Sequence, residues 1–403
     1  MPTPTAVTEP APTPSASQNN LVYVLAGESS GDLHASNLVR ALKAHRPELQ
    51  FRGMGGDKLA AEGMTLVKHI RETNFMGFVE VVKNLRSIKR MFRQVKADIA
   101  AQQPATILLI DYPGFNLRMA KWAKTALQPA PTVVYYISPQ VWAWKTSRVK
   151  TIRAYTDLML CILPFEEAFF QEHQVPVTFV GHPLLDAIAP QLEVPPGRLR
   201  QEMQLPGEKK LVALLPGSRK AEIKRMLGPM LEVARRLPQV AFVLAGAGTQ
   251  TEDFFREQLA DTHVHLVHDR TYDVLQAADY ALVTSGTATL ETALFGVPQI
   301  VCYRGDWLSY QIAKRLVMGR IEYISLVNLI LDKPAVPELI QGAMNPNRLE
   351  QELRKLLAEG AVTQQMRADY HTLWQRLGAT GASHVAAEAI LPLLPTALPA
   401  EKL

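Results

Sequence analysis

Residues 21–35 have the sequence LVYVLAGESSGDLHA, which decides the fold class of the chain. The apolar run from Leu21 to Ala26 predicts a buried strand, and the turn after it leads into a helix. Strand, turn and helix in this order form the repeating unit of a parallel α/β sheet. The two glycines of the turn surround hydroxyl and carboxylate groups, which suits binding of phosphate or sugar hydroxyls at a helix N-terminus. The alternative is that Ser30 or Asp32 only caps the helix.

The same alternation of short apolar runs and helical patterns occurs twice along the chain. The expected strands are residues 21–26, 51–53, 106–110, 132–137, 158–163 and 178–180 in the first half, and 211–215, 241–245, 264–267, 280–283 and 299–303 in the second. The expected linker is the proline-rich segment 189–207, within which residues 198–204 favour a short helix. We therefore predict an α/β fold with two parallel-sheet domains, whose loops after the strands face a cleft between them.

The overall composition is that of a soluble globular protein with about two to three domains. Hydrophobic residues make up 47% of the 403 residues and charged residues 20%, which excludes general disorder and a polytopic membrane protein. Residues 1–20 are rich in Pro, Thr, Ser and Ala and contain no Lys or Arg, so we expect a disordered tail without an export or transit signal. The longest uncharged run, between Lys124 and Lys145, is broken by prolines and polar residues, so no segment is expected to span a membrane.

The cysteine and acidic residues give no sign of a metal site. Cys161 and Cys302 are far apart and match no metal-ligand spacing, so both are expected to be buried thiols of a protein in a reducing compartment. No Asp-x-Asp pair occurs in the chain, and we therefore expect no metal at a diphosphate and no other cofactor. A nucleic-acid partner is not expected either, because no aromatic–basic RNA motif is present.

The first half contains a second candidate loop, residues 110–116, with the sequence IDYPGFN. Asp111 follows a buried strand, which is where a general base would meet a substrate hydroxyl. The alternative is that Asp111 only caps the next helix or fixes the turn.

Residues 135–144, YYISPQVWAW, contain four aromatic side chains. These rings either stack on a sugar or, as is more common for such clusters, belong to the core.

The second half carries two loops typical of nucleotide binding. Residues 214–219, LLPGSR, end the first strand of this half with a small-residue turn and Arg219, whose guanidinium suits a diphosphate. Residues 284–291, TSGTATLE, follow an apolar strand and begin a helix whose first N–H groups suit a phosphate. Glu291, about one turn into that helix, is placed to hold both hydroxyls of a ribose. Two such loops at equivalent sheet positions are hard to explain as helix caps alone.

Nine runs of residues, in order between residues 21 and 331, resemble the lipid-A-disaccharide synthase family. They are AGESSGDLHA, MGFVEVV, IDYPGFN, YYISPQVWAWK, LPFE, FVGHPL, LLPGSR, SGTATLE and SLVNLI. The resemblance implies a glycosyltransferase of the GT-B type, with two Rossmann-like domains and C-terminal helices that return to the N-terminal domain. It also implies an inverting hexosyltransferase that joins UDP-2,3-diacylglucosamine to 2,3-diacylglucosamine 1-phosphate (lipid X). The implied products are the β(1→6) lipid A disaccharide 1-phosphate and UDP.

The resemblance further implies roles for the residues at matching positions. Asp111 occupies an acidic position that the family needs for activity, and it is the expected base for the acceptor 6-hydroxyl or a residue that orients the acceptor. The expected UDP and donor contacts are Arg219, Ser218, Ser285, Gly286, Thr287, Glu291 and Asn328, and the expected acceptor or sugar contacts are Glu28, Ser30 and Asp32. Some members have a second aspartate where this chain has Gly114, which makes Asp111 the better candidate here.

The position of the basic residues is more informative than the net charge of +5. A predicted helix carries basic residues at helical spacing and apolar residues on its other side; the basic ones are Lys83, Arg86, Lys89, Arg90, Arg93 and Lys96. The pattern alone favours an ordinary domain helix with a solvated basic face, whereas acylated substrates favour contact with anionic lipid. With such substrates, we expect a cytoplasmic protein bound peripherally to the inner face of the cytoplasmic membrane.

The expected organisation is a tail at residues 1–20, an acceptor domain at 21–190, a UDP-sugar donor domain at 208–345 and helices at 346–403 that pack back on the N-terminal domain. The same last segment could instead pair with a second subunit, so a homo-oligomer is an open alternative. Among enzymes, the alternative is another UDP-sugar protein of this fold, either the peptidoglycan glycosyltransferase or a UDP-N-acetylglucosamine 2-epimerase. Outside enzymes, it is a non-catalytic nucleotide-sugar or lipid-binding protein.

Overall fold

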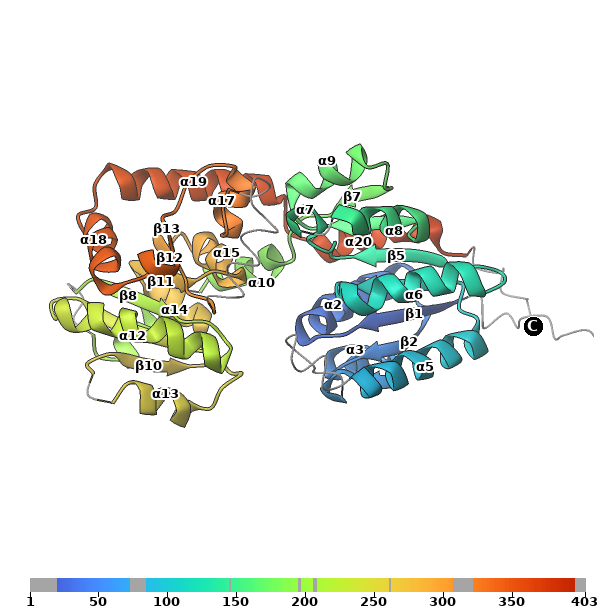
Figure 1. Ribbon diagram of the computed structural model, residues 1–403, viewed down its shortest axis with the longest axis horizontal. Coiled ribbons are helices and arrows are strands. Elements are labelled where there is room, and N and C mark those ends of the chain that lie inside the picture. Colours follow the sequence, from blue (N-terminus) through green and yellow to red (C-terminus); the bar gives the residue numbers. More distant parts are fainter. Residues whose placement is uncertain are drawn as a thin grey trace, which may run out of the picture.

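The protein, seen in a computed structural model, has two parallel-sheet domains that lie side by side (Figure 1). The structure describes residues 20–72, 85–144, 146–194, 197–205, 209–260, 262–306 and 322–395. The strand pairs within both sheets are parallel. The predicted α/β fold with two Rossmann-like domains is therefore confirmed.

The N-terminal sheet has seven strands in the order β3-β2-β1-β4-β5-β6-β7. The strands are β1 (Leu21–Ala26), β2 (Gln50–Gly55), β3 (Thr65–His69), β4 (Thr106–Ile110), β5 (Thr132–Tyr136), β6 (Leu158–Cys161) and β7 (Val177–Phe179). The helices of this half are α2 (Ser29–His45), α3 (Asp57–Ala61), α5 (Leu85–Gln102), α6 (Pro113–Ala126), α7 (Val141–Trp144), α8 (Val149–Tyr155) and α9 (Pro164–Glu172), with short 3-10 turns η1 (Ile70–Glu72) and η2 (Thr146–Arg148). The chain order reverses between β1 and β4, where parallel α/β sheets bind ligands.

The C-terminal sheet has six strands in the order β10-β9-β8-β11-β12-β13, with the reversal between β8 and β11. The strands are β8 (Leu211–Leu215), β9 (Ala241–Gly246), β10 (His265–His268), β11 (Tyr280–Thr284), β12 (Gln299–Tyr303) and β13 (Glu338–Ile340). The helices are α11 (Arg198–Glu202), α12 (Lys220–Arg236), α13 (Glu252–Gln258), α14 (Thr271–Ala277), α15 (Thr287–Leu294), α17 (Leu326–Leu331), α18 (Pro346–Leu357) and α19 (Ala361–Leu377), with the 3-10 turn η3 (Gln341–Ala343).

Burial on both faces of each sheet explains which strands the sequence predicts well. The four strands beside the two reversals, β1, β4, β8 and β11, are buried along their whole length. Such strands are continuous apolar runs, because helices cover both faces. The edge strand β3 is half-buried or exposed and β13 has only three residues, so neither forms an apolar run that the sequence would reveal. Cys161 and Cys302 are buried, as predicted.

The chain passes from the N-terminal to the C-terminal domain before it reaches the expected linker at residues 189–207. Helix α10 (Leu184–Leu192) contributes Leu185 and Ile188 to the large core that underlies the C-terminal sheet. The carbonyl oxygens of Gln191 and Val194 accept hydrogen bonds from Gln276 of α14 (2.6 and 2.8 Å). The crossing therefore lies near residues 181–183, whereas the predicted boundary was residue 190, because the proline inside α10 does not end this helix.

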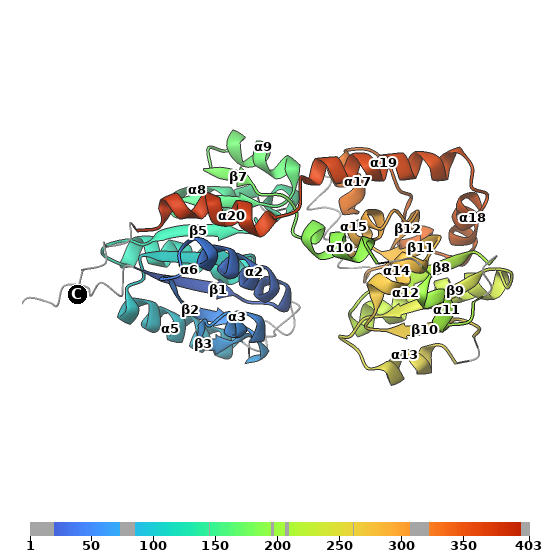
Figure 2. The same cartoon turned by 180° about the vertical axis from the view of Figure 1, so that it is seen from behind.

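The C-terminal helices divide between the two domains (Figures 1 and 2). Helices α18 and α19 supply Leu353 and Leu373 to the C-terminal core. Helix α20 (Ala382–Ile390), followed by η4 (Leu391–Leu393), supplies Ala386 and Ile390 to the N-terminal core beside α2. We expected all of residues 346–403 to pack back on the N-terminal domain; among the described residues, α20 and η4 make this return, because the apolar faces of α18 and α19 are already used in the C-terminal domain.

The two crossings between domains touch each other. The N–H of His182 donates to the carbonyl oxygen of Leu377 (3.2 Å), and the Asp186 carboxylate accepts a hydrogen bond from the N–H of Gly381. The outward and return connections are therefore joined by hydrogen bonds at one place. Among the described residues, we find no helix with both the length and the hydrophobicity that a membrane span needs.

Candidate functional site

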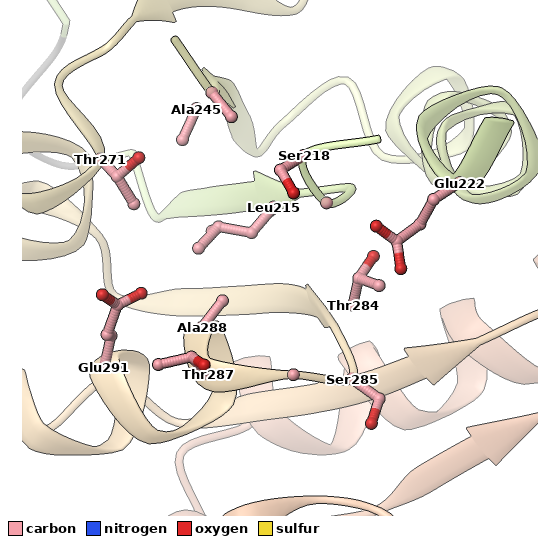
Figure 3. Close-up of a pocket in the computed structure, with 13 residues that line it drawn as sticks. Leu215, Ser218, Glu222, Ala245, Thr271, Thr284, Ser285, Thr287, Ala288 and Glu291 are labelled. Atoms are coloured by element: carbon pink, nitrogen blue, oxygen red, sulfur yellow. The ribbon is translucent and has the colours of Figure 1, made fainter. Parts of the chain in front are cut away.

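A cavity of about 300 Å³ lies where the chain order reverses in the C-terminal sheet (Figure 3). It is formed by the loops after β8, β9 and β11 and by residues at the starts of α12, α14 and α15. Its lining residues are Leu215, Gly217, Ser218, Glu222, Ala245, Ala247, Thr271, Thr284, Ser285, Gly286, Thr287, Ala288 and Glu291. Five of the seven expected donor contacts thus lie around one cavity, although they come from two separate parts of the sequence.

Two glycines let the backbone form the walls of this cavity. Gly217 has φ 105°, in the left-handed region, and a Cβ there would overlap the Glu222 carboxylate. Gly286, the N-cap of α15, has φ 154° and open space where a Cβ would stand. A ligand can therefore approach the first N–H groups of α15 closely, and the positive end of this helix favours an anion there.

The loops around the cavity are held by hydrogen bonds to one another. The Ser218 carbonyl oxygen accepts hydrogen bonds from Thr249 Oγ1 (2.6 Å) and Gln250 Nε2 (3.1 Å), which fixes the turn after β8 to the loop after β9. The Ser285 hydroxyl donates to the Ile324 carbonyl oxygen (3.1 Å), which fixes the start of the α15 loop. The cavity is therefore formed by fixed loops, as binding without large rearrangement requires.

Glu291 lies at the end of the cavity that it shares with Thr271 (Figure 3). Its Oε1 accepts a hydrogen bond from the Tyr272 hydroxyl (3.0 Å). Burial raises the pKa of Glu291, and the hydrogen bond from Tyr272 opposes this effect. A carboxylate held in this way is suited to accept hydrogen bonds from two adjacent hydroxyl groups.

Thr284, at the other end of the cavity beside Glu222, was not among the expected site residues (Figure 3). Its side chain is only 4% exposed, and its Oγ1 has no hydrogen-bond partner within the part of the chain that the structure describes. A buried hydroxyl without a partner lowers the stability of the folded protein by about 1–3 kcal/mol, and such groups are uncommon in native structures. A bound ligand would supply the missing partner.

Two of the expected donor contacts lie outside the cavity lining. Arg219 is exposed at the N-cap of α12, directly after Ser218. Asn328 is buried, and its side-chain amide is used within the α17–β13 connection: it donates to Val336 O and Glu338 Oε1 (both 2.9 Å) and accepts from Val336 N (2.9 Å). Asn328 therefore supports the segment behind Ser285 and does not face the cavity.

The N-terminal domain places Asp111 at the equivalent reversal, between β1 and β4. Ala26 pairs with Ile110, so Glu28 and Asp111 belong to neighbouring loops. Burial, followed by the negative charge of Glu28, raises the pKa of Asp111 to about 6. A carboxylate with this pKa is ionised at neutral pH and is a stronger base than an exposed aspartate.

The other residues of the first loop have different roles. Ser30 is exposed on the first turn of α2, whose N-cap is Glu28. Asp32 is buried and accepts hydrogen bonds at the N-terminus of α3, from the N–H groups of Gly56 (2.6 Å), Lys58 (3.1 Å) and Leu59 (3.2 Å). The Asp32 carboxylate therefore caps a helix, as in the alternative interpretation, but the helix is α3 rather than α2.

The aromatic segment 135–144 belongs largely to the core. Tyr135 and Tyr136 are fully buried in β5. The indole N–H of Trp142 donates to Glu166 (3.0 Å), whose pKa is raised to about 7 by burial. These three side chains agree with the core interpretation of the cluster.

The predicted basic helix is α5, and its apolar side packs against the sheet. Met91, Val95 and Ile99 are buried in the core of the N-terminal domain. The basic residues Arg86, Lys89, Arg90 and Arg93 are exposed, and Lys83 lies outside the described residues. Lys96 is half-buried and contacts two aromatic rings instead. Insertion of an apolar face into lipid is therefore unavailable to the described part of this helix, and only its basic face is free for an electrostatic contact.

Sequence reasoning missed the residues that complete or support the site. Glu222, Thr271 and Thr284 line the cavity, and Tyr272 holds Glu291. Thr284 is the first residue of the predicted nucleotide loop 284–291, directly after the predicted strand 280–283, and this position is the signal that could have revealed it. In the described ranges, no three His, Cys, Asp or Glu side chains come together as a possible metal site.

Comparison with known proteins gives one consistent family. The model of the lipid-A-disaccharide synthetase family matches residues 22–390. The lipid-A-disaccharide synthases of Syntrophus aciditrophicus and Myxococcus xanthus are 41% and 40% identical to the chain, over 93% of its length and 98% and 97% of theirs.

Solved structures with the same fold are more distant in sequence. The UDP-GlcNAc 2-epimerase of Neisseria meningitidis, bound to UDP-GlcNAc, has a TM-score of 0.62 at 13% identity and covers 92% of this chain and 100% of its own. A glycosyltransferase of kitacinnamycin has a TM-score of 0.58 at 16% identity and covers 93% and 99%. These likenesses show the fold alone, whereas the family match and the relatives at 40–41% identity show that this chain belongs to the lipid-A-disaccharide synthase family, the glycosyltransferases of lipid A biosynthesis.

Proposed function

We propose that this chain binds UDP-2,3-diacylglucosamine in the cavity of the C-terminal domain and transfers its sugar to the 6-hydroxyl of lipid X, held near Asp111. The proposal depends on one observation: residues from two separate loops, Gly217–Ser218 and Ser285–Thr287, meet at the reversal of one sheet, and Asp111 stands at the reversal of the other. In this arrangement the first N–H groups of α15 hold the diphosphate and Glu291 holds the ribose hydroxyls. Arg219, beside the same turn, contributes its positive charge.

The proposed reaction is a single displacement that inverts the anomeric carbon. Asp111 takes the proton of the acceptor hydroxyl while the new C–O bond forms, and the bond from the anomeric carbon to the diphosphate breaks. Negative charge then develops on UDP, where the α15 N-terminus and Arg219 stabilise it. Burial and, to a smaller extent, the negative charge of Glu28 keep the pKa of Asp111 high, so the base gains proton affinity without losing its ionised form at neutral pH.

The most direct test is mass spectrometry of the products formed by the purified protein from both acylated glucosamine substrates. We expect an acylated disaccharide 1-phosphate, and UDP released only when lipid X is present. UDP release or sugar epimerisation with the donor alone would instead support the epimerase alternative. Binding of both substrates without any product would support a non-catalytic protein.

Thr284→Val is expected to weaken UDP or donor binding. The variant keeps the shape of the side chain but removes the buried hydroxyl, to which we assign a hydrogen bond with the bound nucleotide sugar. The loss of one such bond corresponds to about a 3- to 10-fold higher Kd. Calorimetric titration with UDP and with the donor measures the effect. Equal affinities of variant and wild type for both ligands would contradict this role, and Thr289→Val is a suitable control, because that buried hydroxyl already donates to the Gly286 carbonyl (2.8 Å).

We also propose that the basic face of α5 holds the protein on anionic lipid at the inner face of the cytoplasmic membrane. Simultaneous Arg86→Glu, Arg90→Glu and Arg93→Glu substitutions should lower binding to vesicles with anionic lipid by at least about 10-fold, because each basic residue near such a surface contributes about 1 kcal/mol. Affinity for UDP should stay the same. The matched control reverses three exposed arginines of the C-terminal domain, Arg198, Arg235 and Arg256. Equal vesicle sedimentation of the two triple variants would refute the α5 contact.

A further inference from the structure

Asp111 and Tyr112 both have left-handed backbone conformations. Their φ angles are 42° and 48°, and neither residue is glycine. Two consecutive residues of this kind are uncommon, because the side chain is crowded by the backbone in the left-handed region. Such a conformation persists only where the surrounding structure fixes it, and it is found preferentially at functional sites.

Hydrogen bonds hold the backbone of Asp111 on both sides. Its N–H donates to the carbonyl oxygen of Tyr136 (3.0 Å), which continues the pairing of β4 with β5. Its carbonyl oxygen accepts hydrogen bonds from the Tyr135 hydroxyl (2.5 Å) and from Asn116 Nδ2 (2.8 Å). Both lone pairs of the Asp111 carbonyl are thus occupied by side chains, one from β5 and one from α6.

Tyr112 is fixed by packing. Its ring lies directly over Gly27, where a Cβ would overlap the ring. Gly27 precedes Glu28, so the loop after β1 and the loop after β4 are in contact at the position where the two carboxylates come near each other. The orientation of Asp111 therefore depends on neighbours from β1, β5 and α6.

We propose that Tyr135 is a positioning residue for Asp111: its hydroxyl holds the Asp111 carbonyl oxygen, keeps the backbone left-handed and thereby directs the carboxylate at the acceptor hydroxyl. The inference rests on the proposed function, in which Asp111 is the base. Tyr135 is fully buried and touches no substrate in this arrangement, so it acts through Asp111. Burial holds the pKa of Tyr135 well above its usual range, so the hydroxyl remains a hydrogen-bond donor at every pH at which the enzyme works.

Substitution of Tyr135 tests the hydrogen bonds to the Asp111 carbonyl oxygen more specifically than substitution of Asn116 does. The side-chain amide nitrogen of Asn116 lies within hydrogen-bond distance of three carbonyl oxygens, those of Leu25 (3.2 Å), Ile110 (3.1 Å) and Asp111. Substitution of Asn116 would therefore loosen β1 and β4 together. A tyrosine hydroxyl has a single hydrogen to donate, and Tyr135 directs it to Asp111, so Tyr135→Phe removes this contact and leaves the ring in the core.

Tyr135→Phe is expected to lower kcat by about 3- to 10-fold, which is the range that one net hydrogen bond supports. The KM for both substrates and the Kd for UDP should stay within about 2-fold of wild type, because a positioning role affects the reacting geometry rather than binding. Tyr23→Phe is the matched control: Tyr23 is equally buried in the same core, but its hydroxyl donates to Asp98 (2.9 Å), away from the proposed site. It should lose stability to a similar extent and keep kcat.

A double-mutant cycle with Asp111→Asn decides whether Tyr135 acts through Asp111. We expect Tyr135→Phe to cause no further loss of turnover in the Asp111→Asn protein, since the base it positions is absent. The same fold-loss in both backgrounds, or an unchanged kcat of Tyr135→Phe alone, would overturn the positioning role while leaving Asp111 as the base. Near-normal turnover of Asp111→Asn would refute the base and, with it, the positioning role.

Discussion

Replacing Asp111 by asparagine is expected to lower kcat by about 10²–10⁴-fold, the range that a general base contributes. Asparagine has nearly the same shape and keeps the backbone contacts of residue 111, but it cannot accept the proton of the acceptor hydroxyl. The Kd for UDP should be unchanged, because the cavity in which we propose that UDP binds is lined by residues of the other domain. Turnover is measured as disaccharide formed per enzyme molecule, and UDP binding by calorimetry. A variant with near-normal turnover would rule out Asp111 as the base.

The same variant should be at least as stable as the wild type, which separates loss of chemistry from loss of folding. The folded protein raises the pKa of Asp111 to about 6, so at higher pH it holds a carboxylate that would be more stable in the unfolded chain. Because the pKa rises by about two units and each unit corresponds to about 1.4 kcal/mol, removing this charge is expected to raise the free energy of unfolding at pH 7.5 by about 2–3 kcal/mol. The difference should disappear as the pH falls below about 4, where Asp111 is protonated in both states of the wild type.

The pH dependence of the wild-type rate offers a further measurement on Asp111. A base must be deprotonated, so kcat/KM should decrease as the pH falls through about 6, the pKa of Asp111. An acid limb near pH 4 would indicate an exposed carboxylate instead. The residual activity of Asp111→Asn should lack this limb.

Glu291→Ala is expected to raise the Kd for UDP by about 10- to 100-fold, because hydrogen bonds to a charged group are worth about 1.5–3 kcal/mol. If Glu291 holds the ribose, affinity for UMP and uridine should fall by the same factor, since all three ligands share this sugar. Tyr272→Phe removes only the hydroxyl that orients the Glu291 carboxylate (3.0 Å), and it should have a smaller effect of about 2- to 5-fold. An unchanged Kd for UDP in Glu291→Ala would refute the ribose contact.

The sequence was sufficient for the central strands and for the loops that follow them. These strands are buried on both faces, so their apolar runs are visible without any knowledge of their neighbours. The loops at the two reversals could likewise be predicted to carry the site, because parallel α/β folds bind ligands at such places. The sequence pattern could not predict which residues of these loops line the site and which only support neighbouring elements.

Asp32 and Asn328 show why this distinction depends on distant partners. Each is a polar residue in a family motif, and each uses its side chain to satisfy backbone groups of another element: Asp32 at α3 and Asn328 at residues 336–338. Thr284 is the reverse case, since it lies at the end of an ordinary strand, but its hydroxyl borders the cavity and has no hydrogen-bond partner among the residues that the structure describes. Only the three-dimensional positions of the acceptors and donors distinguish these cases. Helix α5 illustrates the same limit, because the sequence does not show that its apolar side packs in the protein core.

The meeting of the two domain crossings has a mechanical consequence. The chain leaves the N-terminal domain beside Gly181 and returns beside Gly378 and Gly381. The two connections between the domains therefore lie next to each other and are held together by hydrogen bonds. Sliding of one domain along the other would break the hydrogen bond from His182 to Leu377, whereas rotation about that point leaves it intact. The three glycines have φ between 82° and 99°, and glycine tolerates a wider range of backbone angles than any other residue. We therefore expect any movement of the C-terminal domain relative to Asp111 to be a rotation about these connections, close to which Trp142 and Phe165 of the N-terminal domain pack against the C-terminal core.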